Sequence, residues 1–289
     1  MRAGTPIISI IIAIRIALIT GMLLASAALL AHPGIDQQIV DVTARLEAAP
    51  RDASLYIKRG ELHRIHREWN LAQKDFDRAA RLQQDRRIAH FHIARLQLDR
   101  GEPKKALRHV NLYLRHESNS LSGHVIRGQA LAELGRYRAA ADAYTLAIDG
   151  VVEGRPRPDD YLERARALRS AGAQHYDEAI RGLEDGVKRL GAPVTLLRLA
   201  IEIELEMGRT DAALARLDRI ADSAARKERW LSERGDILTD ANRPTEARQA
   251  YQAALSAIGR LSENRRRNTA TERLEEHVRS ALEQLGSDG

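Results

Sequence analysis

The sequence has no cysteine and few aromatic residues, and both absences narrow the kinds of protein that it can encode. Without cysteine there is no disulfide, no cysteine-ligated zinc site and no thiol nucleophile. Aromatic residues make up 4% of the 289 residues, too few for a typical β-sandwich or β-barrel, or for a protein that stacks nucleic-acid bases on rings. Alanine, leucine, arginine and glutamate, which favour helices, dominate instead. The composition therefore predicts an all-α protein.

The short motifs that identify many enzymes are absent as well. There is no HExxH zinc motif, no glycine-rich phosphate loop, no GxSxG nucleophile elbow and no acidic metal-binding loop. We therefore expect no catalytic residue, no metal site and no cofactor, and a protein that is not an enzyme.

Positive charge is not gathered into one block of the sequence. The formal net charge is +6, from 46 basic and 40 acidic residues. The two signs are mixed along every segment, a pattern typical of a solvated helical surface. Because there is no basic stripe, we expect no nucleic-acid partner.

The N-terminal 31 residues read as an export segment. Residues 7–31 are apolar except for Arg15, and small residues gather near Ala27 and Ala31. The favoured interpretation is a signal peptide over 1–31, cleaved after Ala27 or Ala31, because Arg15 inside a bilayer would cost about 2.5–3.5 kcal/mol. The alternative is an uncleaved membrane anchor, the only case in which we expect membrane contact. Both interpretations predict an exported protein, either periplasmic or secreted, or held by the anchor outside the cytoplasm.

A period of 34 residues organises the remainder of the chain. Three sets of residues recur at that step: Gly60, Ala94 and Gly128; Ala72, Ala106 and Ala140; Phe76, Val110 and Tyr144. Each unit contains two apolar patterns of helical period separated by a turn. Gly101 and Gly135 stand where the first helix of a unit must end.

This pattern of small and bulky positions resembles the tetratricopeptide repeat. The resemblance implies a right-handed α-solenoid of about six helix-turn-helix repeats with helical caps. The expected repeats are 53–86, 87–120, 121–154, 158–190, 194–226 and 228–260, of which the first, third and sixth match best. We expect an N-terminal capping helix within 32–52, and a C-terminal capping helix over 262–285 followed by a tail, together 261–289. Segment 151–160, which contains two prolines, is either a long turn or a hinge.

The resemblance also implies which residues face the concave groove, where proteins of this family hold peptides. The candidate partner-binding residues are Ile57, Glu61, Arg64, Phe91, Arg95, Asp99, Gln129, Arg166, Arg169 and Arg198. The family's clamp for a C-terminal carboxylate is not present, because Ile57, Glu61, His92, Ser122 and Ile126 occupy its positions. The arginines at 166, 169 and 198 either bind acidic groups of a ligand or pair with Glu202 and Glu206.

Phe91 and Trp230 are the aromatic residues that the packing pattern does not use, and the other nine fall at packing positions. Phe91 is a candidate anchor for a partner. Seven of the ten histidines lie between residues 63 and 124. His63, His90 and His124 stand where a packed ring is expected, so we interpret them as packing residues, with a metal site as the weaker alternative.

These observations predict an exported, non-catalytic scaffold that binds a peptide or partner protein on its concave groove. Two other hypotheses stay open. One is a membrane-anchored subunit of an envelope assembly that uses its convex face or its caps. The other is an envelope protein that binds metal through the histidines of 63–124.

Overall fold

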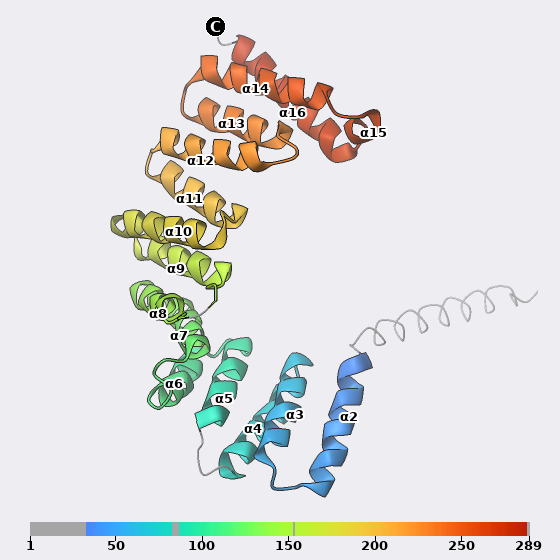
Figure 1. Cartoon of the computed structure of the whole chain (residues 1–289), viewed down its shortest axis with the longest axis vertical. Helices are drawn as coiled ribbons and strands as arrows, with labels where there is room; N and C mark the ends of the chain where they lie inside the picture. The colour runs from blue at the N-terminus through green and yellow to red at the C-terminus, as the bar shows by residue number, and fades with distance from the viewer. Residues whose placement is uncertain (1–32, 83–86, 153, 288–289) are drawn as a thin grey trace, which may run out of the picture. The chain divides into compact units, whose positions relative to one another are not determined.

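The computed structural model describes residues 33–82, 87–152 and 154–287, and every regular element in these ranges is a helix (Figure 1). The prediction of an all-α fold built from stacked helix pairs is confirmed. The expected signal peptide or anchor over 1–31 lies outside the described residues. None of the helices in the described part of the chain combines the length and the apolar run needed to cross a bilayer.

The helices follow one another with short turns between them, and consecutive helices pack side by side within each compact unit (Figure 1). Their bounds are α2 Pro33–Ala48, α3 Ala53–Ile65, α4 Trp69–Leu82, α5 Arg87–Asp99, α6 Pro103–Leu114, α7 Leu121–Glu133, α8 Tyr137–Asp149, α9 Pro158–Ala171, α10 Tyr176–Leu190, α11 Val194–Glu206, α12 Thr210–Ser223, α13 Glu228–Asp240, α14 Pro244–Gly259, α15 Glu263–Arg266 and α16 Thr269–Ser287. A short 3-10 helix, η1 Ala173–His175, precedes α10.

The chain forms two compact units that meet in sequence between Ser118 and Asn119. Unit 1 contains α2 to α6, and unit 2 contains α7 to α16. Segment 151–160 lies inside unit 2, where α8 packs against α9. The segment therefore connects two helices of one unit, and its last three residues, 158–160, already belong to α9.

Helix pairs approach closely where a ring packs on a glycine. A Cβ atom added to Gly128 would lie 2.8 Å from the ring of Tyr144, and one added to Gly60 would lie 2.5 Å from the ring of Phe76. Both rings are fully buried. The small and bulky positions of the 34-residue pattern are thus the two sides of one helix crossing. Tyr137, expected at a packing position, is instead 37% exposed.

The turn between the two helices of a repeat uses a left-handed residue. Gly101 and Gly135 have φ of +68° and +70°, which glycine adopts without steric cost, and so they end α5 and α7. Arg67 and Asn242 take the same conformation at equivalent turns, with φ of +62° and +56°. The stop positions expected from the sequence are confirmed at both glycines.

The N-terminal cap is a single helix. Helix α2 buries Val42 and Leu46 against Leu55 and Leu62 of α3. A new helix starts at Ala53 because the Asp52 carboxylate accepts a hydrogen bond from the Ser54 backbone amide at 2.9 Å.

The C-terminal cap differs from the expected continuous helix over 262–285. Its first part is the four-residue α15, and the long helix α16 begins only at Thr269. Asn268 is the cause of the break, since its side-chain oxygen accepts from the Ala270 backbone amide at 3.0 Å and starts a new helix. Helix α16 packs on α13 and α14 and buries Val278 completely.

Replacing Gly128 with leucine should destabilise the protein by about 1–3 kcal/mol, because the new side chain must occupy space that the Tyr144 ring fills. Gly259→Leu is the matched control, since this exposed helical glycine has no atom within 4 Å of the added Cβ. Thermal and urea unfolding of both variants measures the difference. Equal stability of the two variants would show that the assigned crossing is wrong.

Candidate functional site

The first helices of the repeats in unit 1, α3 and α5, carry six of the predicted groove residues, and five of these contact one another. Glu61 is at the centre of the group. Its carboxylate accepts hydrogen bonds from Arg64 and Arg95, each at 3.1 Å. Arg64 also pairs with Asp99 of the next repeat. Ile57 lies half-buried one turn before Glu61.

His92 completes this group although the sequence did not single it out as a binding residue. Its Nδ1 atom lies 2.7 Å from Glu61 Oε1. Burial alone would raise the pKa of Glu61, but the hydrogen bonds from His92 and Arg64 and the charges of Arg64 and Arg95 outweigh it and lower the pKa to about 2. The carboxylate of Glu61 is therefore charged at neutral pH, and its partners hold it in place.

Phe91, the predicted anchor, is half-buried and packed by its neighbours. Its ring centroid lies 5.1 Å from that of Tyr113 and 5.3 Å from that of His92, which it meets edge to face. The Arg95 guanidinium lies 5.9 Å from the same ring. This chain thus covers part of the Phe91 ring, and the role of this residue as an anchor for a partner stays a prediction.

The four predicted residues of unit 2 do not form one cluster. Gln129 is exposed on α7, and Arg166 on α9 pairs with Glu163 of its own helix at 2.5 Å. Arg169 pairs with Glu202 at 3.0 Å and with Glu206, both on α11. Of the two roles left open for this arginine, an internal ion pair is the one that the structure contains.

Arg198 extends the same arrangement by one repeat. From α11 it pairs with Glu233 of α13 at 3.1 Å, and its guanidinium lies 5.7 Å from the Trp230 ring. Each first helix of unit 2 from α9 onward is thus joined to the next by an arginine–glutamate pair. These ion pairs neutralise most of the positive charge that the arginines would otherwise present to a ligand.

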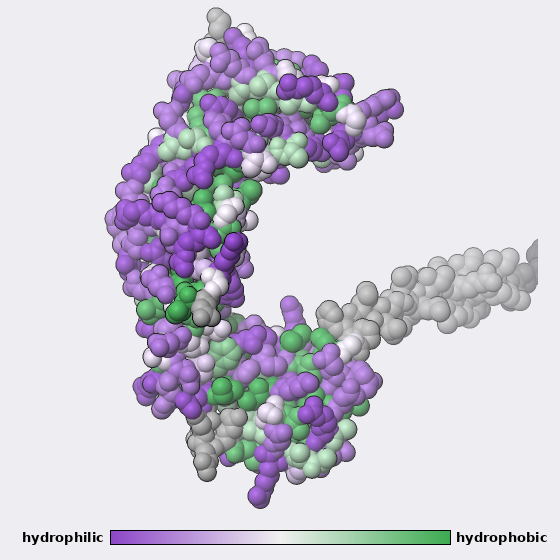
Figure 2. All heavy atoms as spheres, in the orientation of Figure 1, coloured by the Kyte–Doolittle hydropathy of each residue, from purple (hydrophilic) through white to green (hydrophobic). Residues whose placement is uncertain are grey.

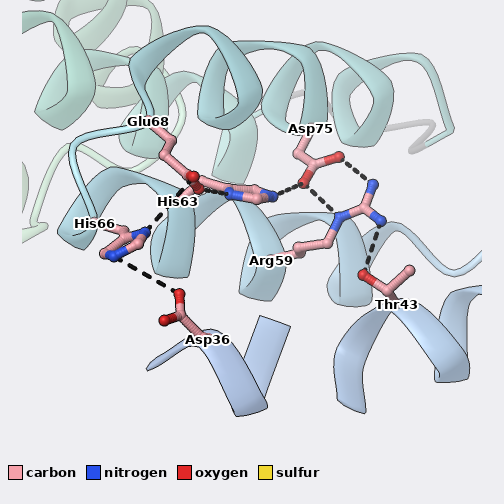
Figure 3. Close-up of polar contacts among 7 residues, drawn as sticks. All are labelled: Asp36, Thr43, Arg59, His63, His66, Glu68 and Asp75. Carbon is pink, nitrogen blue, oxygen red and sulfur yellow. Dashed lines mark hydrogen bonds and ion pairs between the residues drawn. The ribbon is translucent and has the colours of Figure 1, made fainter. Parts of the chain in front are cut away.

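The histidines near the N-terminal cap belong to a chain of polar contacts that joins α2, α3 and α4 (Figure 3). His63 is buried, with Nδ1 at 2.5 Å from Glu68 and Nε2 at 3.9 Å from Asp75. Arg59 donates two hydrogen bonds to Asp75, at 2.7 and 2.8 Å, and a third at 3.2 Å to Thr43 of α2. These contacts give His63 a structural role between helices.

Of the other histidines, His66 borders these contacts, and His90 and His109 form a separate pair. His66 lies 3.7 Å from Asp36 and 3.6 Å from Glu68 at the edge of the same contacts (Figure 3). His90 and His109 meet through their Nδ1 atoms at 3.1 Å, and burial together with the nearby His90 lowers the pKa of His109 to about 4. Within 33–82, 87–152 and 154–287, no three histidine, aspartate or glutamate side chains are placed to hold a metal ion.

A pocket that the sequence did not predict lies in unit 2, between the start of α13 and the first half of α16. Its volume is about 570 Å³. Trp230 and Leu274 form an apolar wall, and Arg229 and Arg273 stand at its rim. The sequence held one signal for it, because Trp230 does not fit the packing pattern. The sequence did not give the position of α16, which forms the other wall of the pocket.

Replacing Glu61 with glutamine should destabilise the protein most at neutral pH, and less as the solution is acidified. The folded pKa of about 2 lies below the ordinary value of 4.5, so the charged carboxylate stabilises the fold above pH 4.5. This contribution is lost as the pH falls from 4.5 through about 2. The shift corresponds to a contribution on the order of 3 kcal/mol.

Urea unfolding of wild type and Glu61→Gln at pH 7, 5 and 3 measures this dependence. Glu47→Gln is the control, because Glu47 is exposed on α2 and forms no ion pair with a described residue. A penalty for Glu61→Gln that is the same at all three pH values would contradict the assigned role of the carboxylate.

Comparison with known proteins identifies the repeats. A tetratricopeptide repeat model matches residues 57–122, and a tetratricopeptide repeat-like domain model matches residues 165–276. Together the two matches span more than half of the chain. No curated protein sequence matches this chain significantly.

Several solved structures have the same fold at low sequence identity. A tetratricopeptide repeat protein from Parabacteroides merdae aligns with a TM-score of 0.52 and 16% identity, over 90% of this chain and 98% of that one. The C-terminal part of a repeat-containing protein from Cytophaga hutchinsonii aligns with a TM-score of 0.62 and 14% identity, over 80% and 93%. PilW, a type IV pilus biogenesis factor, aligns with a TM-score of 0.55 and 16% identity, over 65% and 86%. At these identities the likeness shows the fold alone, and with the two repeat-model matches it shows that this chain belongs to the tetratricopeptide repeat family.

Proposed function

We propose that this protein is an exported, non-catalytic scaffold that binds a peptide or a segment of a partner protein on the first helices of its repeats. The matches to tetratricopeptide repeat models support this proposal, because proteins of this family are typically non-enzymatic scaffolds for protein–protein interaction. In this proposal residues 1–31 direct export, six repeats span 53–260, and 32–52 and 261–289 cap the two ends.

The observation that carries the proposal is the preorganised face of α3 and α5. Glu61 orients Arg64, Arg95 and His92 through hydrogen bonds of 2.7–3.1 Å. Phe91 is held by Arg95 and His92 on the same helix. A surface whose side chains are already fixed loses little conformational entropy when a partner binds, so more of the contact energy appears as affinity.

The proposed export rests on the sequence of residues 1–31, where a short apolar stretch and small residues follow the charged Arg15. An exported scaffold would meet its partners in the cell envelope or outside the cell. The alternative of a membrane-anchored assembly subunit keeps this segment and uses its convex face or its caps instead.

The intact mass of the protein recovered from cells should be lower than that of the full sequence by the mass of 27 to 31 residues. This loss is expected because a signal peptidase cuts after small residues such as Ala27 or Ala31. Mass spectrometry of a C-terminally tagged chain, expressed in full, makes the measurement. Recovery of the complete mass from the membrane fraction would favour the anchored alternative.

Altering the α3–α5 face should remove a partner that the wild-type chain captures from cell-envelope extract. In the full-length tagged chain, Phe91→Ala with Arg95→Glu should lower recovery of that partner at least tenfold, because both side chains are on the proposed binding face. Arg108→Glu is the control, since Arg108 is exposed on α6, the second helix of the same repeat.

Quantitative mass spectrometry of the captured proteins compares the three chains, and circular dichroism verifies that each variant is folded. The same partner recovered in equal amount by all three would show that this face is not used. A parallel comparison of Arg166→Glu with wild type tests the first helices of unit 2 separately.

A further inference from the structure

The pocket between α13 and α16 combines an apolar wall with two arginines that have no carboxylate partner among the described residues. Trp230 is half-buried on α13, and Leu274 faces it from α16. The volume of about 570 Å³ is in the range of sites that bind small ligands or an anchoring side chain. Hydrophilic residues cover most of the surface that is visible in Figure 2.

The charges that line the pocket divide into paired and unpaired groups. Glu228 is 3% exposed and pairs with Arg226, which also donates to Thr271 at 3.1 Å. Arg229 and Arg273 are exposed, and neither forms an ion pair with a described residue. The Arg229 guanidinium lies 5.4 Å from the Trp230 ring centroid, against the apolar wall. The pocket groups without an ion-pair partner among the described residues are therefore both positive, and the Arg229 guanidinium lies next to the Trp230 indole.

The pocket is held open by a link between α13 and α16. His277 of α16 lies 2.8 Å from Asp236 of α13, whose carboxylate also accepts a hydrogen bond from the buried Tyr251 hydroxyl at 2.8 Å. Tyr251 in turn packs on Gly235. Because the helix crossing positions Tyr251, it also positions α16, and the pocket walls do not have to assemble when a ligand arrives.

We propose that this pocket binds a segment of a partner protein in which a bulky apolar side chain is flanked by aspartate or glutamate residues. The apolar side chain would pack on Trp230 and Leu274, and the carboxylates would pair with Arg229 and Arg273. Tryptophan and arginine are the residue types that most often dominate binding energy at protein interfaces. Arginine also pairs with a carboxylate through two parallel hydrogen bonds. The inference rests on the proposed scaffold function and assigns that scaffold the chemistry of one partner segment.

An acidic peptide fits these observations better than a nucleic acid. Two unpaired arginines make too small a positive field to follow a phosphate backbone, and the remaining charges of the pocket are already paired. The apolar wall formed by Trp230 and Leu274 suits one large side chain. A short single-stranded DNA is nevertheless included as a competing ligand in the test.

The probe is a fluorescein-labelled peptide with one central Phe and four alternating Asp and Glu residues on each side. We expect it to bind the full chain, and Arg229→Glu and Arg273→Glu each to weaken binding at least tenfold. Arg219→Glu is the matched control and should change affinity less than twofold, because Arg219 is exposed on α12 and lies outside the pocket. Two control peptides, one with Ser in place of Phe and one with Lys in place of the acids, should bind at least tenfold more weakly.

Tryptophan fluorescence gives a second readout of the same site. The chain has two tryptophans, Trp69 in unit 1 and Trp230 in the pocket. In a Trp69→Phe background the emission reports on Trp230 alone, and the acidic peptide should shift it. Adding Arg273→Glu should abolish the shift at the same peptide concentration while leaving the thermal melt unchanged.

The inference is overturned if the acidic peptide does not bind the full chain. Equal affinity in Arg219→Glu and Arg273→Glu, equal binding of the lysine peptide, or tighter binding of a ten-nucleotide single-stranded DNA would overturn it as well. In any of these cases the scaffold function would stand if the α3–α5 variant still loses its captured partner. If the peptide binds at Trp230 but that variant loses no partner, the pocket stands and the α3–α5 face fails.

Discussion

The close packing of a ring on a glycine determines the rest of this structure. Gly60 lies under Phe76, Gly128 under Tyr144 and Gly235 under Tyr251. In each pair the ring is sixteen residues further along the chain, at the equivalent place on the second helix of the repeat. Because no side chain separates the two helices there, they approach closely, and their outer faces present a regular surface to the next repeat.

That regular stacking places charged side chains of one repeat beside those of the next. The second helices of unit 2 are joined by Arg209 to Asp177 and by Arg243 to Asp211, both at 2.5 Å and both across 32 residues. Exposed pairs of this kind contribute little to stability, because water and salt screen their attraction. Their main consequence is that many charged side chains form ion pairs between repeats and are therefore not available to a ligand.

A sequence with a 34-residue step therefore predicts its fold well, because the small and bulky positions recur and each crossing depends only on residues within one repeat. The sequence marks Gly128 as a small position and Tyr144 as a bulky one, and the structure adds that the two pack on each other. The chemistry of the binding faces could not be predicted in the same way. For Arg169 the sequence left two roles open, a ligand contact or a pair with Glu202 and Glu206, and only the structure places these carboxylates beside it.

The pocket at Trp230 was missed for a different physical reason. Its second wall is α16, which has no counterpart in the repeat and begins at Thr269 because Asn268 interrupts the preceding helix. A continuous helix from 262 would have presented other residues to α13. Trp230 falls outside the packing pattern, but this fact alone does not locate the pocket.

The same irregularity explains why unpaired arginines are found at this end of the chain. Arg198 finds its partner Glu233 on the next first helix, 35 residues on. After α14 the described chain continues with the short α15 and then α16, which packs on α13 and α14 and brings Arg273 into the pocket beside α13. The arginine–glutamate pairs between first helices therefore stop at Glu233 of α13. Arg229 and Arg273 have no ion-pair partner among the described residues, and the proposed partner segment would supply the carboxylates that pair with them.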